Sequence, residues 1–167
     1  MYLDSQIAQL LHDEHQKTLD LMNRLEERTT GRKAKAVPDA NDAATVALLA
    51  DLHAELRATT GHHFNFEEDN IFPALSAIGD VAIPHILRQE HDLLRNMSEF
   101  MLPAVEKARA EGFTADSWAE FCELALELVD RQISHIQKEE MGLLPTLSGL
   151  FEDDRDGELV MLYAEAS

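Results

Sequence analysis

Cysteine, basic residues and long apolar runs are all scarce in this chain of 167 residues. The single cysteine, Cys122, excludes an intrachain disulfide and a metal cluster held by several thiolates. Lysine and arginine total 14 against 32 acidic residues, which gives a net charge of −18 with neutral histidines. Nucleic acids and anionic membrane surfaces are therefore not expected as partners, because both bind through basic residues. No apolar run approaches the roughly 18 residues of a membrane-spanning helix.

The length and the first residues bound the organisation of the chain. A chain of this length buries a continuous core, so we expect one domain over residues 1–167. The helical part should cover about residues 4–145, and an acidic tail should follow over residues 146–167. The start, M-Y-L-D-S-Q, lacks the basic stretch and apolar run of a secretory signal, so we expect a cytoplasmic protein.

Apolar residues recur at helical spacing in four long segments, and no strand-like alternation is evident. These segments run from about residue 4 to 29, from Asn41 or Asp42 to Pro73, from Ala82–Pro84 to Gly112, and from Thr114 or Asp116 to Pro145. Pro73 and Pro145 are expected to kink or end their helices, because proline lacks the backbone N–H. Short connections between long helices predict an all-α protein, an up-down-up-down four-helix bundle with a short C-terminal extension.

One pattern of metal-binding residue types occurs twice. The pattern His-x-x-x-Glu-Glu, followed by proline and leucine, fills residues 63–75 and returns 72 residues later at 135–147. Upstream of each copy, residues 11–15 and 87–91 share Leu-x-x-Glu-His at an offset of 76. A lone His-x-x-x-Glu often arises by chance as a surface pair, but two copies in matching context favour a metal site. The repeat indicates a duplicated helical hairpin that closes around a pair of metal ions.

Helical spacing places these residues on the core-facing stripes. Residues four apart lie on one face of an α-helix, so each motif histidine projects beside its glutamate. Burying two carboxylates is costly without positive charge, and the stripes contain no lysine or arginine. Metal ions are the simplest compensation, and imidazole with carboxylate suits iron, zinc or manganese. Two divalent ions, or trivalent ions sharing an oxide or hydroxide, would leave positions for solvent or a small diatomic ligand.

The candidate ligands are the two lone histidines and the two motif pairs. They are His15, His63, Glu67, His91, His135 and Glu139. Glu90 is a further candidate, either as an extra carboxylate ligand or as a residue outside the ligand layer, since one residue rotates about 100° around a helix. Glu68 and Glu140 follow the motif carboxylates and are expected to hydrogen-bond to histidine ring nitrogens from outside.

At these residues the chain resembles the hemerythrin-like (HHE cation-binding) family of four-helix di-iron proteins. The resemblance extends from His15 to Pro145 and rests on the order His, His-x-x-x-Glu, His, His-x-x-x-Glu. It implies two histidines on each iron and two bridging carboxylates. The implied ligands are His15 and His63 for one iron, His91 and His135 for the other, and Glu67 and Glu139 as bridges.

One position departs from the oxygen-carrying hemerythrins, which have a fifth histidine one turn after the third-helix ligand. Arg95 stands there in this chain. The remaining ligand set is similar to the di-iron domain of iron-centre repair proteins linked to nitrosative stress, and to the iron-sensing domain of a ubiquitin ligase subunit. We therefore expect dioxygen, nitric oxide or peroxide to bind at an open position on the iron that lacks the fifth histidine. Three alternative functions are also compatible with the sequence: an enzyme that consumes peroxide or nitric oxide, an iron or oxygen sensor, and an iron-supply protein in a stress response. A redox partner protein and assembly into a homo-oligomer are further alternatives.

Overall fold

The computed structural model describes residues 4–39 and 41–165, and this part of the chain is all-helical. The elements of the first half are α1 (Gln6–Thr29), α2 (Gly31–Ala34), α3 (Ala43–Ala58), η1 (Thr59–His63), α4 (Phe64–Phe66), η2 (Glu67–Ile71) and α5 (Phe72–Ala77). The second half contains α6 (Ala82–Glu111), α7 (Ala115–Lys138), η3 (Glu139–Leu143), α8 (Leu144–Leu150) and α9 (Asp153–Glu165). The elements η1 to η3 are π-helical turns, which continue their helices with a wider turn.

Local capping chemistry explains where the long helices begin and end. Asp42 accepts a hydrogen bond from the backbone N–H of Thr45 and so starts α3. Thr114 and Ser117 bond to each other's backbone N–H groups as a capping box and start α7. Helix α6 ends before Gly112, whose φ of 77° favours glycine. These boundaries confirm the starts and stops predicted from the sequence.

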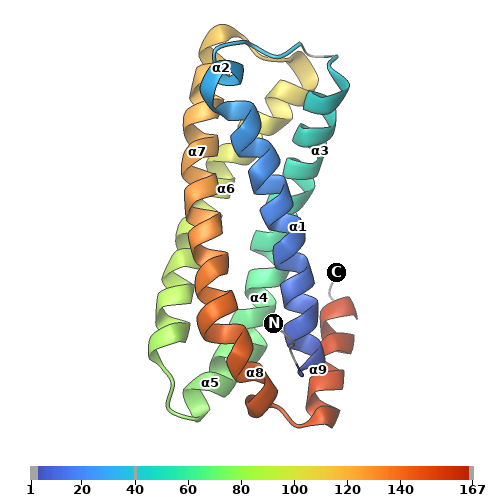
Figure 1. Cartoon of the computed structure of the whole chain (residues 1–167), viewed down its shortest axis with the longest axis vertical. Helices are drawn as coiled ribbons and strands as arrows, with labels where there is room; N and C mark the ends of the chain where they lie inside the picture. The colour runs from blue at the N-terminus through green and yellow to red at the C-terminus, as the bar shows by residue number, and fades with distance from the viewer. Residues whose placement is uncertain (1–3, 40, 166–167) are drawn as a thin grey trace.

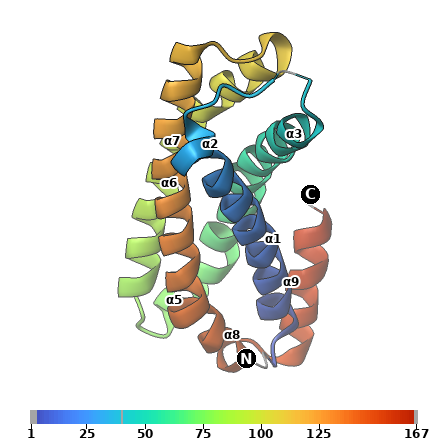
Figure 2. The same cartoon turned by 45° about the horizontal axis from the view of Figure 1, so that its top comes forward.

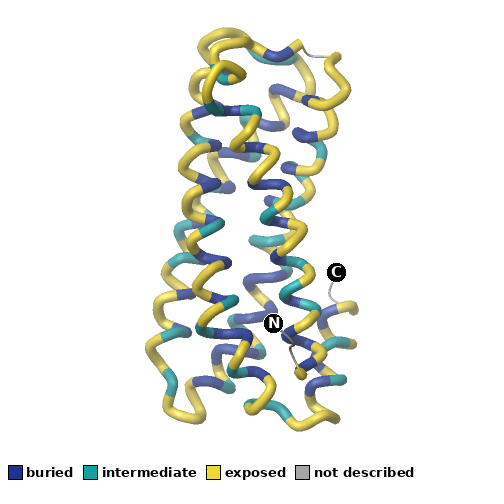
Figure 3. Tube along the Cα trace, viewed as in Figure 1, coloured by how far each residue is buried: buried dark blue, intermediate teal, exposed yellow. Residues whose placement is uncertain are grey.

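The long helices lie side by side along the long axis of the molecule (Figure 1). Helix α1 packs against α7 and α3, and α6 packs against the same two helices, so the four form a closed ring. Buried residues follow the inward faces of the helices and exposed residues follow the outward faces (Figure 3). The core consists of two apolar clusters, one toward the α2 end and one toward the α5 and α8 end. No described helix combines the length and apolar character that a membrane span needs.

The sequence repeat returns in the structure as a repeated π-helical turn. One such turn begins at Glu67 and the other at Glu139, which are equivalent positions of the two motifs. Each turn passes directly into an α-helix with proline in its first turn, Pro73 in α5 and Pro145 in α8. Neither proline ends its helical segment; each follows a change of helical geometry at the predicted place.

The predicted C-terminal extension forms α9, which lies alongside α1 in both views (Figures 1 and 2). Asp156 of α9 is buried and caps the start of α1 from outside that helix. Its carboxylate accepts hydrogen bonds from the Ser5 hydroxyl at 2.7 Å and from the backbone N–H groups of Gln6 and Ile7. These bonds satisfy donors that a helix N-terminus otherwise leaves without partners, so Asp156 fastens α9 to the rest of the protein.

Asp156→Ala is expected to lower the free energy of unfolding by about 1–3 kcal/mol, because it leaves a hydroxyl and two backbone donors without their acceptor. Urea unfolding followed by circular dichroism measures the change. Glu158→Ala is the control, since Glu158 lies on the same helix in an exposed pair with Arg155 and should change stability by less than about 0.5 kcal/mol. Equal unfolding midpoints for Asp156→Ala and the wild type would contradict this role.

Candidate metal centre

The six predicted ligands lie together in one buried layer between the two apolar clusters. Four helical segments supply them: α1, the segment from η1 to η2, α6, and the segment from α7 to η3. The exposed fractions are His15 2%, His63 7%, Glu67 0%, His91 0%, His135 1% and Glu139 0%. Residues far apart in the sequence therefore meet at one place in the core, as the repeated motif predicts.

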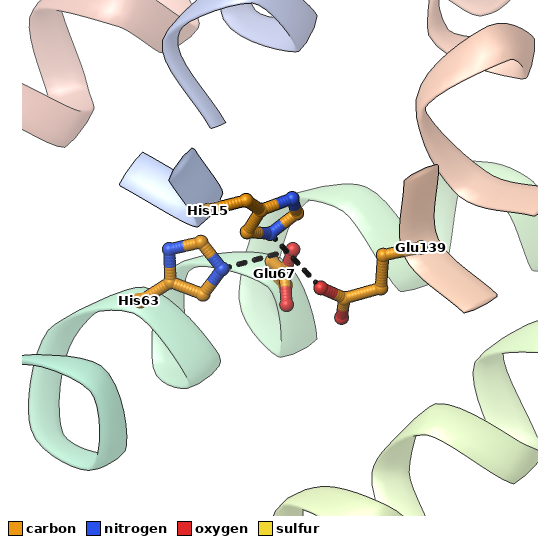
Figure 4. Close-up of side chains that lie close together, drawn as sticks. All are labelled: His15, His63, Glu67 and Glu139. Carbon is orange, nitrogen blue, oxygen red and sulfur yellow. Dashed lines mark ion pairs between the residues drawn. The ribbon is translucent and has the colours of Figure 1, made fainter. Parts of the chain in front are cut away.

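Glu139 lies between histidines from both halves of the repeat. One of its oxygens, Oε2, is 3.0 Å from Nε2 of His15. Figure 4 marks this pair with a dashed line. The other oxygen, Oε1, is 3.0 Å from Nε2 of His135 and 3.6 Å from Nε2 of His91. The two oxygens thus face different histidines, which is the orientation of a carboxylate that bridges two ions.

Glu67 has the same arrangement on the opposite side of the layer. Its Oε1 is 3.4 Å from Nε2 of His63, and its Oε2 is 3.3 Å from Nε2 of His91. Ligand atoms of His15, His63, Glu67 and Glu139 all lie within 4.8 Å of one another, and so do those of His91, His135 and Glu139. The layer therefore offers two neighbouring groups that could each hold a metal ion, and Glu139 belongs to both.

Most of the inward-facing atoms of this layer make no hydrogen bond to any described residue. They are His15 Nε2, His91 Nε2, His135 Nε2, and both carboxylate oxygens of Glu67 and Glu139, all buried and without a hydrogen-bond partner among the described residues. These atoms lie close to one another, but their contacts do not have hydrogen-bond geometry. Burying polar atoms without hydrogen-bond partners is energetically costly. Imidazole nitrogens and carboxylate oxygens pointing at a common centre suit iron, zinc or manganese.

Three of the histidines are oriented from outside by glutamates. Nδ1 of His15 lies 2.7 Å from Glu140, and Nδ1 of His91 lies 2.8 Å from Glu68. Both contacts confirm the predicted roles of Glu140 and Glu68. Glu90 lies 3.0 Å from Nδ1 of His135, so it belongs to this outer layer and not to the ligand groups. Such contacts place the proton on Nδ1 and leave Nε2 free to bind a metal.

Tyr163 was not predicted as part of the site, but the structure places it beside the ligand layer. Its phenol oxygen lies 3.3 Å from Nδ1 of His63, and the residue is buried. Tyr163 belongs to α9, outside both copies of the repeat. Burial and the nearby acidic residues Glu14 and Glu67 raise the pKa of Tyr163 above its usual value, so the phenol stays neutral.

The charges of the layer shift the pKa values of its members in opposite directions. Burial alone would lower the pKa of His15, but close contacts with Glu139 and Glu140 outweigh it and raise that pKa to about 9. The same competition raises the pKa of His91 to about 9 and that of His135 to about 10. Burial by itself would raise the pKa of Glu139, yet the charge of His135 and the contacts with three histidines hold it well below its usual range. The two carboxylates thus attract positive charge strongly, either protons or metal ions.

A cavity of about 310 Å³ opens beside one half of the layer. The ligand residues along its wall are His15, His63, His135 and Glu139, and Tyr163 lines it as well. The other half is covered by aromatic rings: Phe64 stacks on His91 with ring centroids 3.9 Å apart, and Phe72 stacks on the same histidine at 5.5 Å. The cavity therefore reaches the layer beside His15 and His63 and also contacts His135 and Glu139.

Arg95 does not face the ligand atoms. Its guanidinium pairs with Glu68 at 2.8 Å and donates to the side chain of Asn65 at 2.9 Å. It is not among the residues that line the cavity. At the position where oxygen carriers have a fifth histidine, this chain thus has a cation that neutralises the outer carboxylate of His91.

The helical fold and the buried His/Glu layer define a protein built to hold metal ions inside a helical core. The sequence profile of the hemerythrin HHE cation-binding domain matches residues 6–147. The chain therefore belongs to the hemerythrin HHE family, which confirms the resemblance seen in the motifs. A search of curated proteins finds no match.

Proposed function

We propose that this protein holds a carboxylate-bridged pair of iron ions and binds a small oxidant there: dioxygen, nitric oxide or peroxide. The proposal places the ion pair at the centre of an up-down-up-down four-helix bundle. His15 and His63 would hold one ion, His91 and His135 the other, with Glu67 and Glu139 bridging. When bound, the iron pair would supply electrons and an open coordination position for the oxidant.

The observation that carries the proposal is the orientation of the two buried carboxylates. Each of Glu67 and Glu139 directs one oxygen toward a histidine of the first half of the chain and the other toward the second half. A site for a single ion would not need two carboxylates that both span the layer. Two carboxylates with four neutral imidazoles carry only two negative charges, which favours a metal pair that takes further ligands from solvent or from a diatomic.

The lining of the cavity combines polar and apolar side chains. The hydroxyls of Thr18 and Thr59 both donate to Glu55, which keeps one wall of the cavity polar. Phe64 and Ile136 add apolar surface to the cavity lining beside the ligand residues. The cavity volume of about 310 Å³ is large enough for a diatomic molecule or peroxide beside His15 and His63. We propose the open position on the ion of His15 and His63, because both histidines line the cavity and Arg95 does not.

The test is the optical spectrum of the iron-loaded, reduced protein as air is admitted. A new absorption band that persists, and that disappears when oxygen is removed, would support reversible binding. Immediate and lasting conversion to a ferric spectrum would favour an enzyme that consumes oxidants or a sensor of oxidants. Repeated addition of peroxide or nitric oxide then separates these two, since only an enzyme turns over many equivalents. A spectrum that responds to none of the three oxidants would contradict the proposal.

A further inference from the structure

Helix α9 lies outside the family match, which ends at residue 147, and yet it reaches the metal layer. Its buried face consists of Asp156, Leu159 and Tyr163. Asp156 fastens the helix to the start of α1, and Leu159 is fully buried in the apolar cluster below the layer. The helix therefore occupies a defined place beside α1 (Figure 2), and Tyr163 is held at the end nearest the ligands.

Aromatic contacts hold the ring of Tyr163 in position. Phe66 meets it edge to face, with ring centroids 4.9 Å apart and an interplanar angle of 83°. The ring of His62 lies 4.2 Å away on another side. The phenol oxygen is thereby directed at Nδ1 of His63, 3.3 Å away. These ring contacts hold the phenol oxygen beside the outer nitrogen of His63.

The chemistry of imidazole gives this contact its direction. A histidine binds metal through a nitrogen that carries no proton, and Nε2 of His63 is the atom beside Glu67. The proton must then be on Nδ1, which donates to the phenol oxygen of Tyr163. Without that acceptor, the buried Nδ1–H would lose its partner, and the other tautomer, with the proton on Nε2, would compete with metal binding.

We propose that Tyr163 is a positioning residue of the metal centre, which fixes the ring and tautomer of His63 and makes α9 part of the site. This inference rests on the proposed metal pair. It also predicts an asymmetry, because the other three histidines contact carboxylates, which increase the basicity of a metal-bound imidazole more than a neutral phenol does. The ion held by His15 and His63 is therefore the more weakly bound of the two, and it lies beside the cavity.

The experiment compares metal release from the wild type, Tyr163→Phe and Met161→Ala. Phenylalanine keeps the ring that packs on Phe66 and removes only the oxygen. Met161 lies on the same helix with 62% of its surface exposed, so its replacement is the matched control. Each protein is loaded with iron, passed through gel filtration and mixed with a chelator. In Tyr163→Phe, one of the two ions should leave about 10- to 100-fold faster while the other is unchanged, the size expected when an outer partner of a ligand is lost.

Each outcome has a separate meaning. Equal release from Tyr163→Phe and the wild type, with both ions bound in each, would overturn the inference and leave the proposed metal pair intact. A wild type that retains no metal would overturn both. An intense visible band of the ferric wild type that is absent from Tyr163→Phe would show that the phenolate binds iron directly, which would also overturn the positioning role. Circular dichroism of the variants shows that the helical fold is kept in each comparison.

Discussion

Glu139→Gln is expected to abolish tight binding of both metal ions. Glutamine has the same shape, but it lacks the negative charge and offers only one oxygen to the two sides of the layer. Glu139 faces His15 through one oxygen and His135 through the other. In either orientation of the glutamine side chain, one of these histidines would face the amide nitrogen in place of a carboxylate oxygen. The loss of affinity should exceed the roughly 10- to 100-fold effect of removing an outer partner. Metal analysis after gel filtration measures it.

Glu127→Gln is the matched control for this variant. Glu127 lies on α7, in the same helical segment as Glu139, but its side chain is 55% exposed in a pair with Arg131. It should therefore retain the full metal content of the wild type. If Glu139→Gln kept the same metal content and the same rate of release to a chelator, Glu139 would not be a ligand, and the bridging arrangement would be wrong.

Removal of metal is expected to lower stability and to make the remaining stability fall as pH rises from neutral to alkaline values. Saturation of a site at about 1,000 times its Kd stabilises a protein by roughly 4 kcal/mol. For a chain of this size, that corresponds to about 10 °C in Tm. We therefore expect a loss of about this size or more when a chelator strips the protein, measured by thermal unfolding of the loaded and stripped forms.

The pKa values of the layer give the sign of the pH dependence in the stripped protein. The pKa values of His15 and His91 are raised to about 9 and that of His135 to about 10, above the 6.5 of an unperturbed histidine. The unfolded chain loses these protons first, so their contribution to stability is complete below about pH 6.5 and is lost as pH rises toward 9–10. The pKa values of Glu67 and Glu139 are lowered in the folded protein. Their contribution to stability is therefore present above the pKa of an unperturbed glutamate and is lost as pH falls through the lowered pKa values. The stripped protein should therefore be most stable at mildly acidic pH.

The loaded protein should not show this loss, because its ligand histidines carry no extra protons and the histidines of the unfolded chain are already neutral above about pH 6.5. Metal binding needs neutral imidazoles, so it displaces the protons and strengthens as pH rises. The difference in Tm between loaded and stripped protein should consequently widen from pH 6 to pH 9. Unfolding scans of both forms at these two values measure it. A difference that narrows, or a stripped protein whose Tm does not fall over this range, would contradict the assignment of these histidines to the layer.

Much of this architecture follows from the spacing of residue types. The capping residues Asp42 and Thr114 and the terminal Gly112 predicted helix boundaries, because their effects are local and depend on a few neighbouring residues. The duplicated motif predicted that six residues far apart in sequence would meet. Two copies of His-x-x-x-Glu, each following a lone histidine, bury their polar groups most easily by sharing one layer.

The features that the sequence did not predict depend on tertiary contacts. No pattern of apolar residues predicts the π-helical turns that begin at Glu67 and Glu139. Pro73 and Pro145 follow shortly after these turns and predicted a change in the helix there. The role of Tyr163 depends on how α9 packs against α1. Asp156 holds α9 there by accepting a hydrogen bond from Ser5, which lies near the opposite end of the sequence. Tyr163 lies in the apolar run L-V-M-L-Y-A at residues 159–164, and that run alone does not indicate which part of the protein it contacts.

The most direct test of the central account is a crystal structure of the iron-loaded protein with anomalous scattering recorded at the iron edge. The account predicts two anomalous peaks in the buried layer, one beside Nε2 of His15 and His63 and one beside Nε2 of His91 and His135. Both peaks should lie within bonding distance of Glu67 and Glu139. A single peak, or peaks only at surface carboxylates, would contradict the carboxylate-bridged pair.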